Sequence, residues 1–212
     1  MKNLLIIFIK YPALGEVKTR LAKSIGKPQA KIIYEHLVSD LLENTDDNHF
    51  ERVLFVDPKY KISDYQNFFG KFDYRYQAGE DLGERMDKAF EYSFGLGYQN
   101  IILIGSDIPL LDSTYIKSCF NKLEQEEAIV GPTIDGGYYL IGFSKSSYTP
   151  KIFYNISWSE PTVYNETITR LKDLNVSIAK TWFDIDLQKD LLRYQTIGMK
   201  KRISELSELE IL

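Results

Sequence analysis

The sequence predicts an α/β fold, a mainly parallel β-sheet with helices on both faces. Short apolar runs of strand length alternate along the chain with longer segments whose apolar residues recur every three or four positions. No linker rich in Pro, Ser or Gly and no internal repeat divides the 212 residues, so we expect one domain over residues 1–212. The runs predicted to be strands are residues 4–9, 53–56, 74–77, 101–104, 128–130, 138–143 and 176–180.

The helical segments lie between these runs. The clearest is residues 29–43, where Ile33, Leu37 and Leu41 share one stripe of a helix. Asp112 precedes another segment and has the side chain and position of an N-cap. Strands joined by helical crossovers favour parallel pairing. The predicted helices are residues 29–43, 82–94, 113–123 and 162–174, with a terminal amphipathic helix at 200–212.

Composition excludes several classes of protein. The net charge of −4 argues against a nucleic-acid binder, which would present a basic surface. No stretch is long enough to span a bilayer, and the apolar run at 4–9 is too short for a signal peptide. The single cysteine, Cys119, has no internal disulfide partner, which fits a cytoplasmic protein, and we expect it to be buried. Two histidines leave little material for a serine-type triad or a zinc site, so carboxylates, Lys, Arg and a metal would carry any catalysis.

The most informative motif follows the predicted strand at 101–104. The apolar run ends in Gly105, Ser106 and Asp107, and Pro109 stiffens the backbone that follows. A buried parallel strand would deliver this carboxylate to the carboxyl end of the sheet, where open α/β folds bind ligands. Such a carboxylate suits a hard divalent cation that carries phosphates. The alternative is a strand that ends in an ordinary turn.

A basic loop follows the first predicted strand and leads into a helix. In α/β folds this position holds phosphates through backbone N–H groups and the helix dipole. Lys10, Lys18 and Arg20 would add positive charge there. The loop contains one glycine, Gly15, and therefore matches neither a Walker loop nor a dinucleotide fingerprint. A solvated basic loop remains the alternative.

Two further loop-to-element junctions allow a structural and a functional interpretation. Asp81 could cap the helix at 82–94, while Arg85 could reach a ligand or pair with Glu84 or Asp81. Asp135 and the glycine pair that follows it could form a plain turn or a pocket into which a base or a sugar fits closely.

The last cluster of acids lies near the carboxyl end of the chain. Asp184 and Asp186 would point to the same side if the strand persisted that far. Either could be the second carboxylate of a metal site. Asp186 could equally be the N-cap of a final helical segment that includes Asp190.

Six short blocks follow one another along the chain: residues 15–21, 81–86, 105–109, 135–142, 158–159 and 184–191. In this order they resemble a bacterial family of largely uncharacterised transferases with the nucleotide-diphosphosugar transferase fold, also called GT-A. That family is often described as glycosyltransferase and is related at fold level to phospholactate guanylyltransferase. The resemblance extends from residue 8 to about residue 191.

The resemblance implies roles for particular residues. Lys18 and Arg20 would bind phosphate and act in catalysis, and Asp107 would act with them as a ligand of Mg²⁺ or Mn²⁺. Asp186 would complete the metal site, with Asp184 as the alternative ligand. The residues expected to contact substrate are Gly15, Arg85, Asp135, Gly136 and Gly137, the last three shaping the acceptor or sugar pocket.

The resemblance implies a metal-dependent transferase with a nucleotide or nucleotide-sugar donor and a small acceptor. The basic loop has fewer glycines before its arginine than sugar nucleotidyltransferases have, so glycosyl and nucleotidyl transfer both remain open. A non-catalytic protein that binds a nucleotide or nucleotide sugar is the alternative function. In a third interpretation every motif is a turn or a cap.

Overall fold

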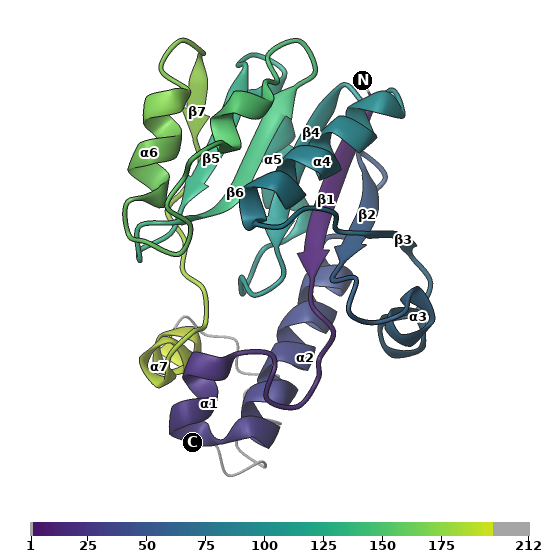
Figure 1. Ribbon diagram of the computed structural model, residues 1–212, viewed down its shortest axis with the longest axis vertical. Coiled ribbons are helices and arrows are strands. Elements are labelled where there is room, and N and C mark those ends of the chain that lie inside the picture. Colours follow the sequence, from purple (N-terminus) through teal and green to yellow (C-terminus); the bar gives the residue numbers. More distant parts are fainter. Residues whose placement is uncertain (1, 197–212) are drawn as a thin grey trace.

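The computed structural model describes residues 2–196, and its core is a seven-stranded sheet of order β3-β2-β1-β4-β6-β5-β7 (Figure 1). All seven predicted strands are present. The pairs β1–β2, β1–β4, β2–β3 and β5–β7 are parallel, while β6 runs antiparallel to β4 and β5. The mainly parallel sheet is therefore confirmed. The strands are β1 (Asn3–Ile9), β2 (Glu51–Val56), β3 (Asp73–Tyr76), β4 (Asn100–Gly105), β5 (Ala128–Pro132), β6 (Tyr138–Ser144) and β7 (Val176–Ile178).

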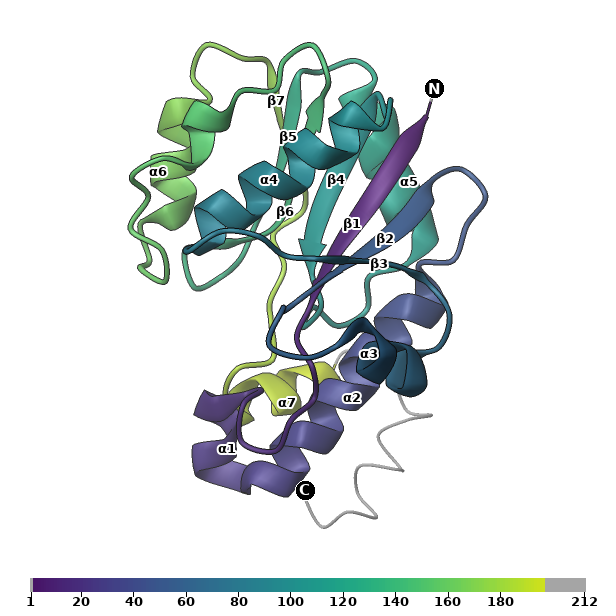
Figure 2. The same ribbon diagram turned by 45° about the vertical axis from the view of Figure 1, so that its right-hand side comes forward.

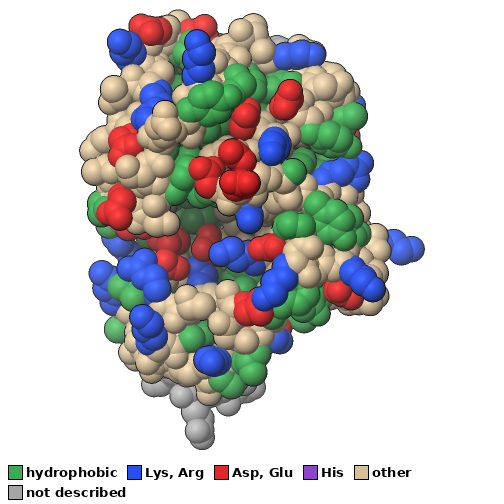
Figure 3. Space-filling model, viewed as in Figure 1, with side chains coloured by type: hydrophobic (Ala, Val, Ile, Leu, Met, Phe, Trp, Pro, Cys, Tyr) green, Lys and Arg blue, Asp and Glu red, His purple; other side chains and the backbone are tan. Residues whose placement is uncertain are grey.

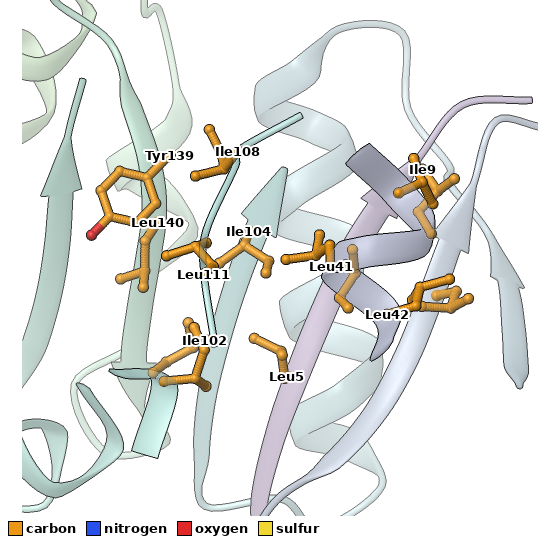
Figure 4. Packing of buried hydrophobic residues seen from close by; sticks show 14 of the residues in the cluster. Leu5, Ile9, Leu41, Leu42, Ile102, Ile104, Ile108, Leu111, Tyr139 and Leu140 are labelled. Atoms are coloured by element: carbon orange, nitrogen blue, oxygen red, sulfur yellow. The ribbon is translucent and has the colours of Figure 1, made fainter. Parts of the chain in front are cut away.

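Helices cover both faces of the sheet, as predicted (Figure 2). β1 is apolar on both sides, because its alternate residues enter different cores. Leu5 and Ile7 pack with α2 (Lys27–Asn44) and α5 (Ser113–Leu123), the face drawn in Figure 4. Leu4 and Ile6 pack on the opposite face with α4 (Leu82–Gly95), α6 (Val163–Arg170) and the short 3₁₀ helix η1 (Pro150–Phe153). Cys119 is buried, as expected.

A third cluster lies beyond the carboxyl ends of β1 and β4. Here α1 (Thr19–Ile25) and α7 (Gln188–Thr196) lie beside the amino-terminal half of α2 (Figure 1). Leu21, Ile33, Ile185 and Leu191 are buried between them. This α1–α2–α7 layer forms one wall of the site described below.

One predicted helix differs in the structure, and α3 (Ile62–Phe69) was not predicted. The helix expected at 162–174 is shorter, because its hydrogen-bonded turns close at Leu171. The helix expected at 200–212 lies outside the described residues. Among the residues that the structure describes, no helix combines the length and apolar character needed to cross a membrane.

The N-cap predicted at Asp112 is confirmed, because the backbone N–H of Tyr115 donates to its Oδ1 at 2.8 Å. Removing this bond leaves an orphan N–H in the first turn of α5. We expect Asp112→Ala to lower the free energy of unfolding by about 1 kcal/mol, measured by urea denaturation. Asp173→Ala removes an exposed acid outside the helices and serves as the control, with a change within about 0.5 kcal/mol. Equal losses in both variants would contradict the capping role.

Candidate active site

Three carboxylates converge at the carboxyl end of the sheet. One oxygen from each of Asp107, Asp184 and Asp186 lies within 4.8 Å of the others. Asp107 follows β4, as expected. Asp184 and Asp186 come from the segment between β7 and α7, which is not a strand in the structure apart from an isolated bridge at Trp182. Asp184 and Asp186 still lie on the same side, as predicted, because the intervening Ile185 points the other way and is fully buried in the α1–α2–α7 layer.

Trp182 fixes the segment that carries the two later acids. Its backbone N–H donates to the carbonyl of Pro132 at 2.9 Å, and its carbonyl accepts from the N–H of Ile134 at 3.2 Å. Its indole N–H donates to the carbonyl of Pro109 at 2.8 Å, two residues beyond Asp107. One side chain therefore ties the β4 loop to the segment before α7. Sequence reasoning missed this role because an aromatic residue there looks like ordinary core.

Lys18 lies between two of the three acids. Its Nζ donates to Asp107 Oδ2 at 2.9 Å and to Asp186 Oδ1 at 3.1 Å, and its side chain is 3% exposed. The residue adopts a left-handed backbone, with φ of 48°, just before α1. Arg20 donates to the other oxygen of Asp186 at 3.3 Å. The structure thus brings together Lys18, Arg20, Asp107 and Asp186, which the sequence singled out separately.

The opposite charges of Lys18 and its two aspartate partners stabilise one another in the ionised form. Burial lowers the pKa of Lys18, but Asp107 and Asp186 outweigh it and the net shift is upward. Burial likewise raises the pKa of Asp107, but the Lys18 ammonium outweighs it and the net shift is downward. Lys18 is therefore a cation and Asp107 an anion at neutral pH.

The charged form of Asp184 is disfavoured in this cluster. Burial, and then the nearby Asp186, Asp107 and Asp135, raise its pKa to about 6, against a smaller lowering effect of Lys18. Crowded oxygen ligands of this kind fit Mg²⁺ or Mn²⁺, since a divalent cation would relieve the repulsion among them. The side chains present therefore match the metal that the sequence motif implied.

Asp186 does not cap α7. Its carboxylate is engaged with Lys18 and Arg20, whereas Asp190 accepts from the N–H groups of Asp186 at 3.2 Å and Leu187 at 2.7 Å. Of the two roles that the sequence left open for Asp186, the structure therefore does not show the cap, and Asp190 accepts the N–H groups before α7 instead. The carboxylate of Asp186 lies in the cluster of three aspartates.

A cleft of about 530 Å³, the donor cleft, opens beside the acids (Figure 3). The loop after β1, the start of α1 and the start of α4 form its walls, and Asp107 and Asp186 lie at its border. Its basic side chains are Lys10, Lys18, Arg20 and Arg85. Gly15 does not line this cleft and instead lies against the side chain of Lys27, so its substrate contact remains a prediction.

Arg85 is oriented by the loop before α4. It donates to the carbonyl of Gly79 at 3.3 Å and to the side-chain oxygen of Gln77 at 3.4 Å, rather than to Glu84 or Asp81. Asp81 caps α4 through the N–H of Glu84 at 2.8 Å, as the structural interpretation expected. The guanidinium of Arg85 is thus held on the wall of the donor cleft by neutral partners and keeps its charge available for an anion.

Tyr34 is a site residue that sequence reasoning missed. Its buried hydroxyl accepts from the N–H of Lys10 at 2.9 Å and lies 3.1 Å from the hydroxyl of Ser106. It therefore joins the end of β1 to the residue before Asp107, and burial raises its pKa. In the sequence Tyr34 belongs to the apolar stripe of α2, and nothing in the neighbouring residues distinguishes it from an ordinary core residue.

The loop between β5 and β6 closes the site on its other side. Asp135 accepts from the hydroxyl of Thr133 at 2.5 Å and from the N–H of Gly137 at 3.2 Å. Asp135 and Gly137 line a smaller hollow of about 150 Å³ with Asp107 and Asp184. Gly136 instead packs against the backbone of residue 161, so the structure itself requires a glycine at this position. The pocket roles expected for the three residues remain predictions.

Comparisons with known proteins identify similar sequences and structures. The model of a family described as "Uncharacterized protein conserved in bacteria (DUF2064)" matches residues 41–160. A curated relative is the 2-phospho-L-lactate guanylyltransferase of Methanocaldococcus infernus (strain DSM 11812 / JCM 15783 / ME), 23% identical over 134 residues. That match covers 63% of this chain and 58% of the relative, less than two thirds of its length.

Solved structures show the same fold. A candidate nucleotide-diphospho-sugar transferase from Desulfovibrio desulfuricans G20 is 34% identical, with a TM-score of 0.91 over 95% of this chain and 90% of that one. Rv0371C from Mycobacterium tuberculosis H37Rv, solved in complex with manganese, is 13% identical. Its TM-score is 0.54 over 91% of this chain and 97% of that one, a likeness of fold alone.

Proposed function

Because this chain belongs to the bacterial family DUF2064 and has the nucleotide-diphospho-sugar transferase fold, we propose that it is a metal-dependent transferase with a nucleotide-activated donor. The observation that carries the proposal is the set of three convergent aspartates beside a cleft whose lining includes Lys10, Lys18, Arg20 and Arg85. A plain turn or cap would need neither the buried lysine between them nor the crowding of their charges.

The donor cleft fits the charged part of such a donor. Its volume of about 530 Å³ lies in the range of small-molecule sites. Asp107, Asp184 and Asp186 would hold Mg²⁺ or Mn²⁺, which when bound would neutralise charge on the donor phosphates. Lys18 and Arg20 border both the acids and the cleft, so they are placed to stabilise charge that builds up on those phosphates.

Two reactions of this class fit the site. In nucleotidyl transfer, an acceptor oxygen attacks the α-phosphorus and pyrophosphate leaves. In glycosyl transfer, an acceptor oxygen attacks the sugar carbon and a nucleoside diphosphate leaves. The relative named as a guanylyltransferase supports the first, and the 34% identical structure described as a candidate sugar transferase supports the second.

A thermal-shift panel tests the proposal. It combines nucleoside triphosphates and nucleotide sugars, each with and without Mg²⁺ or Mn²⁺. A donor at about 100 times its dissociation constant should add about 2.7 kcal/mol of stability. The metal alone should add less, since the Lys18 ammonium already pairs with Asp107 and Asp186.

The pattern of shifts separates the two reactions. Metal-dependent stabilisation by a triphosphate would favour nucleotidyl transfer, and stabilisation by a nucleotide sugar would favour glycosyl transfer. If none of these ligands shifts the melting temperature, the donor site proposed here is wrong.

A further inference from the structure

A third hollow adjoins the acids on the side of α7. This α7 cleft, about 330 Å³ in volume, is lined by Arg20, Asp184, Asp186, Lys189 and Arg193, among others. It meets the donor cleft at Arg20 and Asp186, and it meets the smaller hollow at Asp135 and Asp184. The three aspartates therefore stand where three openings converge, and the donor proposed above accounts for one of them.

The α7 cleft has a basic wall. Lys189 and Arg193 are four residues apart on α7 and so share one side of the helix. The Arg193 guanidinium lies 5.1 Å from the ring of Phe183, a cation–π contact that orients it at the cleft. In the part of the chain that the structure describes, neither Lys189 nor Arg193 forms a salt bridge. Figure 3 shows basic side chains gathered below the hollow, facing acidic side chains above it.

The described acids of the α7 cleft are held by partners other than Lys189 and Arg193. Asp190 accepts two backbone N–H groups at the start of α7, and Asp135 accepts from Thr133 and Gly137. Asp184 and Asp186 belong to the proposed metal site, where Lys18 and a divalent cation would offset their charge. Lys189 and Arg193 are therefore the cations of this cleft whose charge no described carboxylate pairs with directly.

We infer that the α7 cleft binds the acceptor through an anionic group, a phosphate or a carboxylate, held by Lys189 and Arg193. The inference rests on the proposed function, because an acceptor must reach the donor beside the aspartates. The smaller hollow offers such an anion no basic side chain, since its lining contains neither Lys nor Arg. The donor cleft would be filled by the donor.

Anion titration by calorimetry tests this assignment. The probes are inorganic phosphate and succinate, added to the protein with Mg²⁺ and the best stabilising triphosphate or nucleotide sugar at saturation. The variant Lys189→Gln/Arg193→Gln removes both charges and keeps good helix formers. The matched control is Lys23→Gln/Lys172→Gln, which removes two exposed lysines outside the cleft.

We expect the first variant to raise the dissociation constant of the anion at least about tenfold, the loss of a charge-assisted contact, and the control to stay within about twofold. Binding of phosphate alone would identify a phosphate ester as the acceptor, and binding of succinate alone a carboxylate. Equal anion binding by both variants, or none by the wild-type protein, would overturn the inference.

Its failure is distinguishable from that of the proposed function. A donor shift that is unchanged in Lys189→Gln/Arg193→Gln shows a folded protein with an intact donor site, so unchanged anion binding there would reject the α7 cleft alone. If no donor shifts the wild-type protein, the proposed function fails, and the same titration without a donor still decides whether Lys189 and Arg193 hold an anion.

Discussion

Asp107→Asn should lower turnover by at least about 10²–10³-fold while the protein remains folded. The amide keeps the shape of the side chain but removes the negative charge that a divalent cation needs. Lys18 would keep one carboxylate partner, Asp186, so its buried ammonium would remain paired. The loss would therefore fall on the reaction, with little effect on the fold.

The measurement is steady-state turnover with the donor identified by the thermal-shift panel, together with donor affinity with and without metal. Asp57→Asn is the matched control, because Asp57 follows β2 as Asp107 follows β4 but lies outside the cluster of three aspartates. Turnover within about twofold of wild type is expected for this control, since Asp57 lines neither the donor cleft nor the α7 cleft.

The same experiment separates an enzyme from a binding protein. If the chain only binds a nucleotide or nucleotide sugar, the wild-type protein shows no turnover, and Asp107→Asn loses metal-linked affinity alone. Wild-type turnover that survives in Asp107→Asn would contradict the role given to this carboxylate.

Gly136→Ala should lower the free energy of unfolding by about 3 kcal/mol or more. Gly136 has φ of +94°, and a Cβ there would lie 2.1 Å from the carbonyl oxygen of Pro161. The obstacle is backbone, which cannot rotate aside as a side chain can. The N–H of Tyr164 also donates to the carbonyl of Gly136 at 2.9 Å, so moving this loop disturbs the start of α6.

Gly97→Ala is the matched control, measured by the same urea denaturation. Gly97 has nearly the same φ, +93°, but a Cβ would meet nothing within 4 Å. We expect a loss of about 1–2 kcal/mol there, the cost of the left-handed backbone alone. The difference between the two variants measures the contact with Pro161, and equal losses would show that this contact can relax.

Much of the fold could be predicted from the sequence because burial on both faces leaves a continuous apolar run. The five inner strands follow from such runs, whereas the edge strands β3 and β7 follow from short segments that alternate with polar residues. α5 has the predicted bounds, with Asp112 at its start. α3 was missed because it is short: Ile62, Tyr65 and Phe69 lie at helical spacing against the core, but eight residues give only two turns of the pattern. α1 is shorter still and buries Leu21 alone.

The antiparallel direction of β6 follows from the length of the connection that precedes it. Residues 133–137 join β5 to β6, and five residues suit a hairpin but not a crossover between parallel strands. The glycine pair in that loop was available as a turn signal. Such a turn fits the antiparallel hairpin of β5 and β6 in the structure, which also makes β6 antiparallel to β4.

The sequence by itself determined the chemistry available to this protein, namely carboxylates, Lys18 and Arg20 at the ends of apolar runs, because residue type and strand periodicity are local properties. Tertiary structure alone decided which of these groups meet. Lys18 is 89 residues from Asp107 and 168 from Asp186, yet its Nζ contacts both. The strand order and the hydrogen bonds of Trp182 bring these residues, which are far apart in the sequence, close together in space. Such long-range packing depends on the whole core, and no short stretch of sequence encodes it.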